Sequence, residues 1–387
     1  MRIGIDISWA QGSPSGTASY IEGLVHALAA SAAHNELVLL TRSVRRLALP
    51  GLELPGLEGR GAHTRIERVA IDAPLTNVRQ QVALPLALRR LGLDLYHAPA
   101  FFLPLALPLL WPGPTVLGVF DLNFLHLREN RQPGRRAEYL SLALQVPLAA
   151  RQATRIVTLS HSSAVEITRL LHVPGDKVTV IPVAPRDIFR RPPRDDLVEQ
   201  TRDRYGSYYL MVGVLAPQKN VERVLRAFAA LGTHQVRLVL AGRSAGDYAE
   251  RVLRPLARSL GIADRVVFAG AVGDDEVVAL YHGALGLVFP SLGEGFGLPI
   301  VEAMVCGCPV ITSDRSSMPE VAGDAAVLVD PTAEAAIGAA MARLADESVH
   351  REDLTARGLL RGATFTWDTI ARETLRCYEQ AIVDAGT

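Results

Sequence analysis

Residues 286–304 read Gly-Leu-Val-Phe-Pro-Ser-Leu-Gly-Glu-Gly-Phe-Gly-Leu-Pro-Ile-Val-Glu-Ala-Met. This stretch starts as a short apolar strand, continues through a glycine-rich loop and enters an apolar helix. Pro299 is expected in the first turn of that helix, where a missing amide proton costs little. A strand that leads through a glycine-rich loop into a helix is typical of parallel sheets whose faces are covered by helices.

The alternation of short β-branched runs with longer helical patterns extends along the whole chain. The C-terminal half predicts strands at residues 208–213, 237–242, 265–268, 286–289 and 309–312. The N-terminal half predicts strands at 2–6, 37–40 and 155–159 and helices at 17–30 and 162–171. Because the pattern starts again in the second half, the sequence predicts an α/β protein with two Rossmann-like domains.

A proline-rich segment separates the two series. Residues 182–194 read Pro-Val-Ala-Pro-Arg-Asp-Ile-Phe-Arg-Arg-Pro-Pro-Arg, and prolines lack the amide donor that a central strand needs. We therefore expect the boundary in the region 185–205 and divide the chain into an N-terminal domain, 1–185, and a C-terminal domain, 186–366. An amphipathic helix that begins at Trp367 is expected to form the last segment, 367–387.

Composition limits the classes of protein that the chain can belong to. Its 387 residues suit two domains, and 40 basic against 40 acidic residues give a formal net charge of zero, with no sign of a nucleic-acid partner. Three cysteines, at 306, 308 and 377, are too few for a disulfide framework and wrongly spaced for a zinc site, so we expect a cytoplasmic location. The first residues read as a strand and not as a signal peptide.

The glycine-rich loop has the features of a ligand site. Its glycines let the backbone approach a ligand closely, and the free amides and the dipole at the start of the helix suit a diphosphate. Glu302 is expected about one turn into the helix, where it can accept hydrogen bonds from two ribose hydroxyls, and Glu294 can hold a sugar hydroxyl. On spacing alone a second interpretation stays open, in which Glu302 only complements the helix dipole and Glu294 is solvated.

Several blocks along the chain resemble one enzyme family. The segment Glu294-Gly-Phe-Gly-Leu-Pro-Ile-Val-Glu302, with the blocks 307–311 and 316–324 after it, is similar to the signature of glycosyltransferase family 4, a family of retaining enzymes. Further resembling blocks are 94–99, 121–124, 158–163, 212–220 and 365–367. The resemblance implies a nucleotide-sugar donor and the GT-B fold, in which two parallel sheets face each other across a cleft and a C-terminal helix crosses back to the N-terminal domain.

The resemblance also implies roles for individual residues. Glu302 would bind the donor ribose, Glu294 the transferred sugar, and Lys219 the departing diphosphate, where negative charge grows as the glycosidic bond breaks. The chain has lysines only at 177 and 219, which favours a specific need for a compact ammonium group at Lys219 over a solvated surface lysine. The other residues implied are Gly295, Phe296, Gly297 and Leu298 through their amides, Gly16 and Thr17 at the end of the glycine loop 11–17, and Asp121 facing the acceptor.

The chain departs from the family pattern at two positions. Phe120 stands where the family commonly has a histidine near the reacting carbon, and Val214 stands where many relatives have a basic residue. Arg243 is a candidate replacement cation, and His97 and His126 are candidate replacement imidazoles, although a lone histidine is more often structural. These departures support an alternative function, a donor-binding homologue with impaired catalysis and a regulatory or scaffolding role.

The sequence-based hypothesis is a retaining hexosyltransferase. The block 316–321 and the Gly-x-Leu-x-Pro-x-Lys-Asn form of residues 213–220 resemble mannosyltransferase branches, so GDP-mannose is the expected donor and UDP-glucose or another UDP-hexose the next candidate. No Asp-x-Asp motif lies on a suitable loop, so we expect catalysis without a metal ion or another cofactor. A dinucleotide oxidoreductase would need Gly-x-Gly-x-x-Gly after a strand and an acidic residue at the next strand end, and neither half has both.

The expected acceptor is a glycan, a lipid-linked sugar or a small molecule. The apolar segment Phe101–Trp111 is too short and too rich in proline to supply the roughly 20 residues of a membrane-spanning helix. Together with the basic, amphipathic segment Asn77–Arg90, it is a candidate for a peripheral membrane face that receives a lipid-linked sugar. The alternative, which we favour on the sequence alone, is a buried strand at 101–111 and an ordinary surface helix at 77–90.

Overall fold

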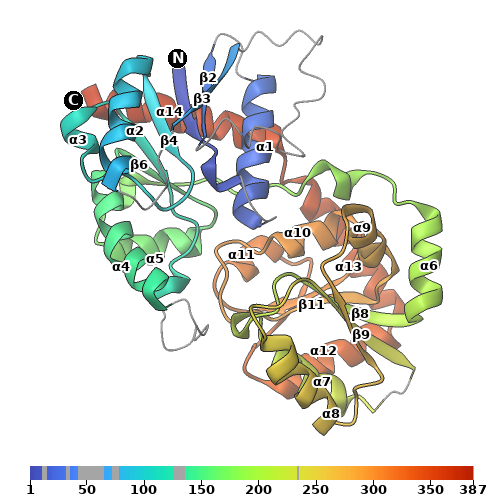
Figure 1. Ribbon diagram of the computed structural model, residues 1–387. Coiled ribbons are helices and arrows are strands. Elements are labelled where there is room, and N and C mark those ends of the chain that lie inside the picture. The colour runs from blue at the N-terminus through green and yellow to red at the C-terminus, as the bar shows by residue number, and fades with distance from the viewer. Residues whose placement is uncertain are drawn as a thin grey trace. The chain divides into compact units, whose positions relative to one another are not determined.

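The computed structural model describes residues 1–10, 15–31, 35–41, 65–71, 78–125, 136–232 and 235–386. The chain divides into two compact units. Unit 1 contains Met1–Leu125, Ala137–Ala184 and Thr366–Thr387, and unit 2 contains Pro185–Phe365. The change between units therefore falls inside the proline-rich segment, and the chain returns to unit 1 at Thr366 (Figure 1).

Unit 1 is built on a parallel sheet with the strand order β3-β2-β1-β4-β5-β6-β7. Its strands are β1 (Arg2–Asp6), β2 (Glu36–Thr41), β3 (Arg65–Ala70), β4 (Leu95–Ala98), β5 (Thr115–Gly118), β6 (Arg155–Thr158) and β7 (Val178–Val180). Its helices are α1 (Gly16–Ser31), α2 (Val78–Leu91), α3 (Leu107–Leu110), α4 (Arg136–Gln152), α5 (His161–Leu171) and α14 (Trp367–Gly386). The central strands are buried along nearly their whole length, because helices cover both faces of such a sheet.

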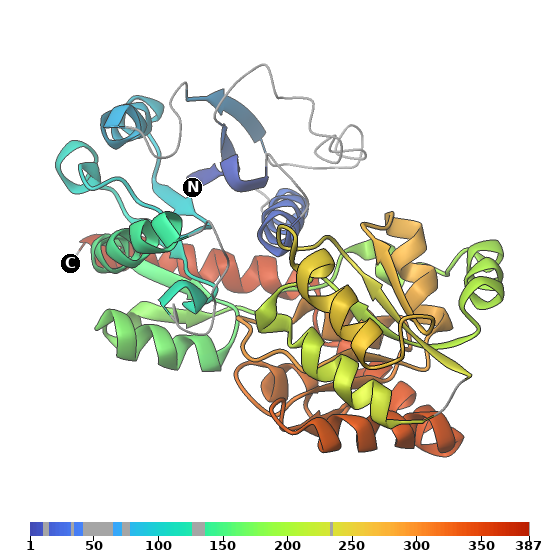
Figure 2. The same cartoon turned by 60° about the horizontal axis from the view of Figure 1, so that its bottom comes forward.

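Helix α14 belongs to unit 1 although it follows all of unit 2 in the sequence. It packs against α1 and contacts β4 and β5, and Figure 2 shows it, in red, among the helices and strands of unit 1. Gly23 on α1 makes room for the indole ring of Trp367, because a Cβ atom at Gly23 would lie 2.0 Å from ring carbon Cζ2. Nδ1 of the buried His97 lies 2.6 Å from the Tyr378 hydroxyl. The prediction that the C-terminal helix crosses back to the N-terminal unit is confirmed.

Unit 2 contains a second parallel sheet, with the order β10-β9-β8-β11-β12-β13. Its strands are β8 (Ser207–Val212), β9 (Val236–Ala241), β10 (Val266–Gly270), β11 (Gly286–Phe289), β12 (Val310–Ser313) and β13 (Val327–Val329). Its helices are α6 (Asp195–Tyr205), α7 (Val221–Ala230), α8 (Arg254–Ser259), α9 (Asp274–Gly283), α10 (Leu298–Val305), α11 (Met318–Ala322), α12 (Glu334–Asp346) and α13 (Ser348–Ala363). Helices α7, α8 and α12 lie on one face of the sheet, and α9 and α10 lie on the other (Figure 1).

The strands and helices predicted from the two alternating series of the sequence are all present, with bounds that differ from the prediction by at most two residues.

The favoured strand at Phe101–Trp111 is wrong. The segment has no regular structure before α3, because Pro104 and Pro108 cannot donate to a strand ladder, and Pro108 instead occupies the first turn of α3. The expected surface helix is α2; Asn77, its expected first residue, lies outside the described residues. Among the described residues, no helix combines the length and apolar character that crossing a bilayer requires.

Candidate functional site

The order of strands in the unit 2 sheet reverses between β8 and β11. From β8 the chain adds β9 and then β10 on one side, and afterwards returns to the other side of β8 to add β11, β12 and β13. In open parallel sheets, ligands bind at the carboxyl ends of the two strands that flank such a reversal. The loop after β8 carries Lys219 and the loop after β11 carries Glu294, so the topology brings both residues to this position.

Lys219 and Glu294 form a close ion pair at the reversal. Nζ of Lys219 lies 2.5 Å from Oε1 of Glu294, and the two side chains are only 18% and 12% exposed. The ammonium group also lies 4.9 Å from the centre of the Phe289 ring, at the end of β11. Lys219 is therefore a mostly buried cation that is paired with Glu294, not a solvated surface lysine. Because a buried charge is costly without a partner, an anionic ligand that takes the place of Glu294 must compensate Lys219 equally well.

Contacts between neighbouring loops hold the pair in place. Asn220 adopts a left-handed backbone conformation, with φ of 61°, and its Nδ2 donates to the carbonyls of Pro290 and Pro331 at 3.0 and 2.6 Å. The Leu292 amide donates to the Gln218 carbonyl at 2.9 Å. The loops after β8 and β11 are thus joined through their backbones as well as through the ion pair.

The loop after β12 supports Glu294 from a third direction. The hydroxyl of the fully buried Ser317 lies 2.9 Å from the Glu294 carbonyl and 2.8 Å from the Phe296 carbonyl. A hydroxyl has one proton, so Ser317 shares it between these two acceptors. The Ser316 hydroxyl donates to the Glu294 carbonyl at 2.7 Å, and Ser316 has an uncommon positive φ of 58°. The two serines fix the backbone of the glycine-rich loop.

The glycine-rich loop presents backbone amides at the start of α10. Gly297 has φ of 101°, a conformation that side-chain-bearing residues rarely adopt, and the helix begins at the next residue, Leu298. The Phe296 ring is buried and packs edge-on against Phe365, with ring centres 5.6 Å apart. Within the described residues, the amides of Phe296 and Gly297 donate to no backbone carbonyl. The side chain of Phe296 therefore anchors the loop while its amide and that of Gly297 can serve an anion.

Glu302 lies one turn into α10 and is half-buried. The hydroxyl of the fully buried Tyr281, on α9, donates to Oε2 of Glu302 at 3.1 Å. Burial raises the pKa of Glu302 to about 7, against the lowering effect of the Tyr281 hydrogen bond and of the Arg186 guanidinium, which itself forms a bidentate ion pair with Asp274. Hydrogen-bond donors on a ligand would favour the ionised form of this carboxyl group.

The candidate residues of unit 1 lie at the carboxyl edge of its own sheet, whose strand order reverses between β1 and β4. Gly16, which is exposed, and Thr17, which is half-buried, are the first residues of α1, the helix after β1. Asp121 follows β5, and its carboxylate accepts a hydrogen bond from the Asn123 amide at 3.0 Å. Residues 11–14 of the glycine loop lie outside the described residues.

Phe120, where the family pattern has a histidine, is a core residue. Its ring is 6% exposed and packs edge-on at 4.7 Å from the Tyr20 ring centre and at 6.2 Å from that of Phe101. His97 is not a substitute in this environment, because its burial lowers its pKa to about 3 and its Nδ1 contacts Tyr378 on α14. His97 thus has a structural role in fixing α14.

The second departure leaves an apolar side chain at the loop after β8. Val214 is 51% exposed, and Lys219 is the one cationic residue in the sequence of that loop, 213–220. Arg243 follows β9 and is exposed. His126 lies outside the described residues.

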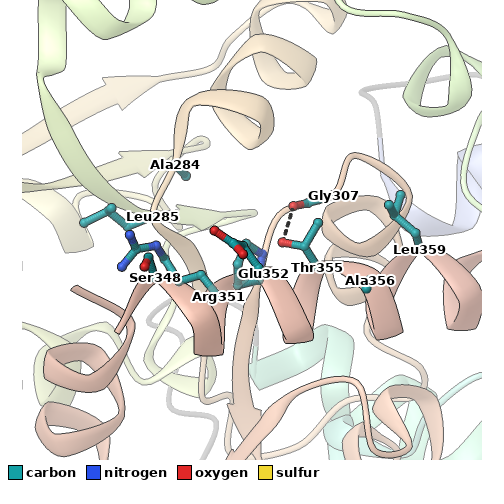
Figure 3. Close-up of a pocket in the computed structure, with 10 residues that line it drawn as sticks. Ala284, Leu285, Gly307, Ser348, Arg351, Glu352, Thr355, Ala356 and Leu359 are labelled. Carbon is teal, nitrogen blue, oxygen red and sulfur yellow. Dashed lines mark hydrogen bonds between the residues drawn. The ribbon is translucent and has the colours of Figure 1, made fainter. Parts of the chain in front are cut away.

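A pocket of about 420 Å³ occurs elsewhere in unit 2 (Figure 3). Its lining includes Leu285, which precedes β11, Pro309, which precedes β12, and Arg351 and Glu352 of α13. The pocket thus lies at the amino edge of the sheet, opposite the edge that carries Glu294, and is not part of the candidate site. Across the part of the chain that the structure describes, no three His, Cys, Asp or Glu side chains are grouped so that they could hold a metal ion.

Three supporting residues were not predicted from the sequence. They are Tyr281, which bonds Glu302, Ser317, which fixes the glycine-rich loop, and Asn220, which joins two loops. The signal that could have identified Ser317 is its place in the loop after the strand predicted at 309–312, at the same edge of the sheet as Glu294. No local pattern marks Tyr281 as a partner of Glu302.

Comparisons with known proteins agree with this architecture. Residues 14–184 match the family model described as Glycosyltransferase Family 4, and residues 196–360 match the model described as Glycosyl transferases group 1. The chain is 32% identical over 291 residues to O-antigen chain mannosyltransferase B of Escherichia coli, which covers 74% of each protein. It is 31% identical to the MMP alpha-(1->4)-mannosyltransferase of Mycolicibacterium hassiacum, over 65% of this chain and 60% of that protein. It is also 32% identical to the serotype-specific mannosyltransferase WbdA of E. coli, of whose length the match spans 30%.

Solved structures show the same fold across nearly the entire chain. Anabaena HepE, solved with UDP and glucose, superposes with a TM-score of 0.74 at 19% identity and covers 98% of this chain and 100% of that one. The glycosyltransferase WaaG, involved in lipopolysaccharide biosynthesis, superposes with a TM-score of 0.68 at 15% identity, over 96% of this chain and 98% of that one. The two family models match one unit each, and the mannosyltransferase B of E. coli is 32% identical over 74% of each protein. The chain therefore belongs to glycosyltransferase family 4 and is a transferase with the GT-B fold.

Proposed function

We propose that the protein is a retaining hexosyltransferase that moves mannose from GDP-mannose to a glycan, a lipid-linked sugar or a small-molecule acceptor. The observation that carries this proposal is the Lys219–Glu294 ion pair at the strand reversal of unit 2, beside the start of α10. The pair offers a cation for a diphosphate and a carboxylate for a sugar hydroxyl within the reach of one ligand. A nucleotide sugar contains both of these groups.

Each residue of the site meets one part of the donor in this proposal. Glu302 accepts hydrogen bonds from the ribose hydroxyls, and Glu294 accepts one from a hydroxyl of the transferred sugar. The Lys219 ammonium exchanges its partner, from the Glu294 carboxylate to a phosphate oxygen. The amides of residues 295–298 face the sugar and the β-phosphate at the positive end of α10. Glu294 and Lys219 thus neutralise each other until the donor supplies better partners.

The transfer itself needs no protein nucleophile. The acceptor hydroxyl attacks C1 of the sugar on the face from which the diphosphate leaves, so the bond from C1 to the phosphate oxygen breaks as the new bond from C1 to the acceptor oxygen forms. The proton of the acceptor hydroxyl passes to a phosphate oxygen of the leaving group. Lys219 and α10 stabilise the growing charge, which is why we propose a reaction that is independent of metal ions. The amides of Gly16 and Thr17 bind the donor phosphates, and Asp121 faces the acceptor.

The names of the relatives support mannose as the transferred sugar. Those of E. coli and M. hassiacum are mannosyltransferases, whereas the HepE structure contains UDP and glucose, which makes a UDP-hexose the next candidate. A cytoplasmic location is also proposed, because Cys306, Cys308 and Cys377 are free and buried.

Phe120 and Val214 support a second candidate function, a homologue that binds the donor but transfers poorly and acts as a regulatory or scaffolding partner. In unit 1 the aromatic ring of Phe120 packs against the ring of Tyr20. A phenyl ring offers no hydrogen bond to a sugar, unlike the imidazole of the family pattern. Tight donor binding without hydrolysis or transfer over a broad acceptor panel would favour this candidate.

A nucleotide panel tests the donor site. GDP, UDP and ADP, each with its common sugars, are added to the protein and the shift in melting temperature is measured, since a ligand that binds the folded state raises it. GDP and GDP-mannose are expected to give the largest shifts. The donor-site assignment fails if none of the nucleotides stabilises the protein.

Donor hydrolysis by single variants tests the residue roles. Lys219→Ala is expected to lower turnover by at least about 100-fold, the range seen for a lost transition-state charge partner. Glu294→Ala and Glu302→Ala each remove a carboxylate that accepts hydrogen bonds from the nucleotide sugar, and each is expected to lower kcat/KM by at least about tenfold. The matched controls are Lys177→Ala, which removes the one other lysine, and Glu199→Ala, on the exposed side of α6. If the site variants hydrolyse the donor as fast as these controls do, the proposed residue roles are wrong, whereas the fold and the family of the protein are unaffected.

A further inference from the structure

Unit 1 exposes a row of leucines on α4. Leu140, Leu144 and Leu148 are 56%, 73% and 43% exposed, and they recur every fourth residue, so they share one side of the helix. An α-helix in a water-soluble domain normally turns such a stripe toward the core. Here the opposite side of α4 already meets the core through residues such as Val146 and Ala150, which are fully buried.

The segment around α3 continues this apolar surface. Leu103, Leu107 and Trp111 are buried and fix the segment, while Leu105 and Leu109 between them are 51% and 87% exposed. Leu105 and Leu109 therefore lie on the surface of unit 1.

Hydrogen bonds place this segment between α2 and α4. The Leu105 amide donates to Oε1 of Gln81 on α2 at 2.6 Å, and Nε2 of Gln152 on α4 donates to the Leu105 carbonyl at 3.2 Å. Val82, next to Gln81, is 45% exposed. We call the exposed side chains of this surface the leucine face: Val82, Leu105, Leu109, Leu140, Leu144 and Leu148.

Exposed arginines lie at the C-terminal ends of the two helices that carry most of the leucine face. Arg89 and Arg90 are exposed at the end of α2, and Arg151 is exposed at the end of α4, one turn beyond Leu148. Among the described side chains between residues 81 and 152, three arginines, at 89, 90 and 151, stand against two acidic residues, at 94 and 121, although the whole chain is balanced at 40 and 40. Exposed apolar side chains with a cationic rim match a bilayer that contains anionic lipids, in which the leucines enter the boundary of the acyl chains and the arginines meet the phosphates.

We infer that the leucine face docks unit 1 on the surface of an anionic lipid bilayer. This inference is independent of the sugar that the enzyme transfers, because no residue of the leucine face belongs to the candidate donor site. It identifies which side chains of the region 77–111 contact lipid and adds α4, which the sequence did not suggest. The chemistry fits an acceptor that is itself held in a membrane.

Flotation with lipid vesicles tests the inference. The protein is mixed with vesicles of phosphatidylcholine alone, or of phosphatidylcholine with phosphatidylglycerol, and the fraction that floats is measured. We expect flotation with the anionic vesicles, which weakens as NaCl rises, and at least about tenfold weaker partitioning for the variant Leu140→Gln/Leu144→Gln/Leu148→Gln. Glutamine keeps helix propensity, so the fold is expected to persist, and circular dichroism checks this.

A matched variant separates lipid contact from a general loss of apolar surface. Val349→Gln/Leu359→Gln/Leu360→Gln removes three exposed apolar side chains from α13, which are 77%, 46% and 74% exposed, and is expected to float like the wild type. A second variant, Arg89→Gln/Arg90→Gln/Arg151→Gln, is expected to lose preference for anionic vesicles.

Three results would overturn the inference. They are a wild type that does not float, an α4 variant that floats as well as the wild type, and sedimentation that shows a dimer which the α4 substitutions convert to a monomer. The last result would assign the leucine face to a second copy of the chain. Donor hydrolysis by the α4 variant is expected to equal that of the wild type, so failure of the lipid inference and failure of the proposed donor site are distinguishable.

Discussion

Removal of one hydroxyl group at Tyr281 is expected to change how donor binding depends on pH. The Tyr281 hydroxyl donates to Oε2 of Glu302 at 3.1 Å and lowers the pKa of that carboxyl group, which burial has raised to about 7. A hydrogen bond to a charged group contributes about 1.5–3 kcal/mol, and one pKa unit corresponds to about 1.4 kcal/mol. Tyr281→Phe should therefore raise the pKa of Glu302 by about one unit, to about 8.

The affinity for GDP should then fall most strongly near neutral pH. If the ribose binds ionised Glu302, affinity rises with pH up to the pKa of the nucleotide-free protein and is constant above it. At pH 7 about half of Glu302 is ionised in the wild type and about a tenth in Tyr281→Phe, which predicts about fivefold weaker binding. At pH 9 the two proteins should bind GDP almost equally.

Isothermal titration of GDP between pH 6 and pH 9 measures this shift. The matched control is Tyr248→Phe, because the Tyr248 hydroxyl makes the same kind of bond, 2.8 Å long, to Glu222 on α7. That variant should keep the pH profile of the wild type. A loss of affinity by the same factor at every pH would refute the reasoning, since Tyr281 would then act only by shaping the site.

The raised pKa of Glu302 also predicts the direction in which the free energy of unfolding changes with pH. The folded protein keeps a proton on Glu302 between the usual pKa of 4.5 and about 7, while the unfolded chain has lost it, so the folded state binds more protons in this window. The contribution of Glu302 to the free energy of unfolding therefore falls as pH rises from about 4.5 to 7 and is constant above.

Three further substitutions test separate parts of the structure. Gly23→Ala should lower the free energy of unfolding by about 1–3 kcal/mol in urea titrations, because its Cβ atom would meet the rigid Trp367 indole, and unchanged stability would contradict the close packing of α14. Ser317→Ala should raise the KM for donor about tenfold and leave the far-ultraviolet circular dichroism unchanged, because the Glu294 backbone loses its support, and an unaltered KM would rule out that positioning role. Phe120→His should cost about 1–3 kcal/mol of stability by burying a polar ring and should not increase donor hydrolysis, whereas a clear gain in hydrolysis would reassign this position to the reaction centre.

The strands and long helices could be predicted because local patterns encode them. Runs of apolar and aromatic residues such as 208–212 are nearly continuous, as buried parallel strands require, and the helix at Leu298 follows from a glycine loop and a proline. The same local reasoning failed at Phe101–Trp111, where a run of apolar residues suggested a buried strand but the buried side chains of Leu103, Leu107 and Trp111 recur every fourth residue, unlike those of a strand. The prolines prevent strand pairing there, so a run of apolar residues is not sufficient evidence for a strand.

Contacts within the candidate site could be predicted only in part. The sequence singled out Lys219 and Glu294 separately, but they are 75 residues apart, and their ion pair depends on β8 and β11 being neighbours in the sheet. Sequence periodicity does not report strand order. The Tyr281–Glu302 bond depends in the same way on how α9 packs beside α10, which no local pattern records.

The return of α14 to unit 1 has a consequence for synthesis on the ribosome. The part of unit 2 from Pro185 to Phe365, which contains its sheet, is continuous in sequence, so it can fold as it emerges. Unit 1 cannot, because its α1 lacks Trp367 and its His97 lacks Tyr378 until the helix after unit 2 has been made. The half of the enzyme that is translated first is therefore completed last, and a nascent chain must keep the apolar side of α1 that later meets α14 from binding other proteins while more than 180 residues are added.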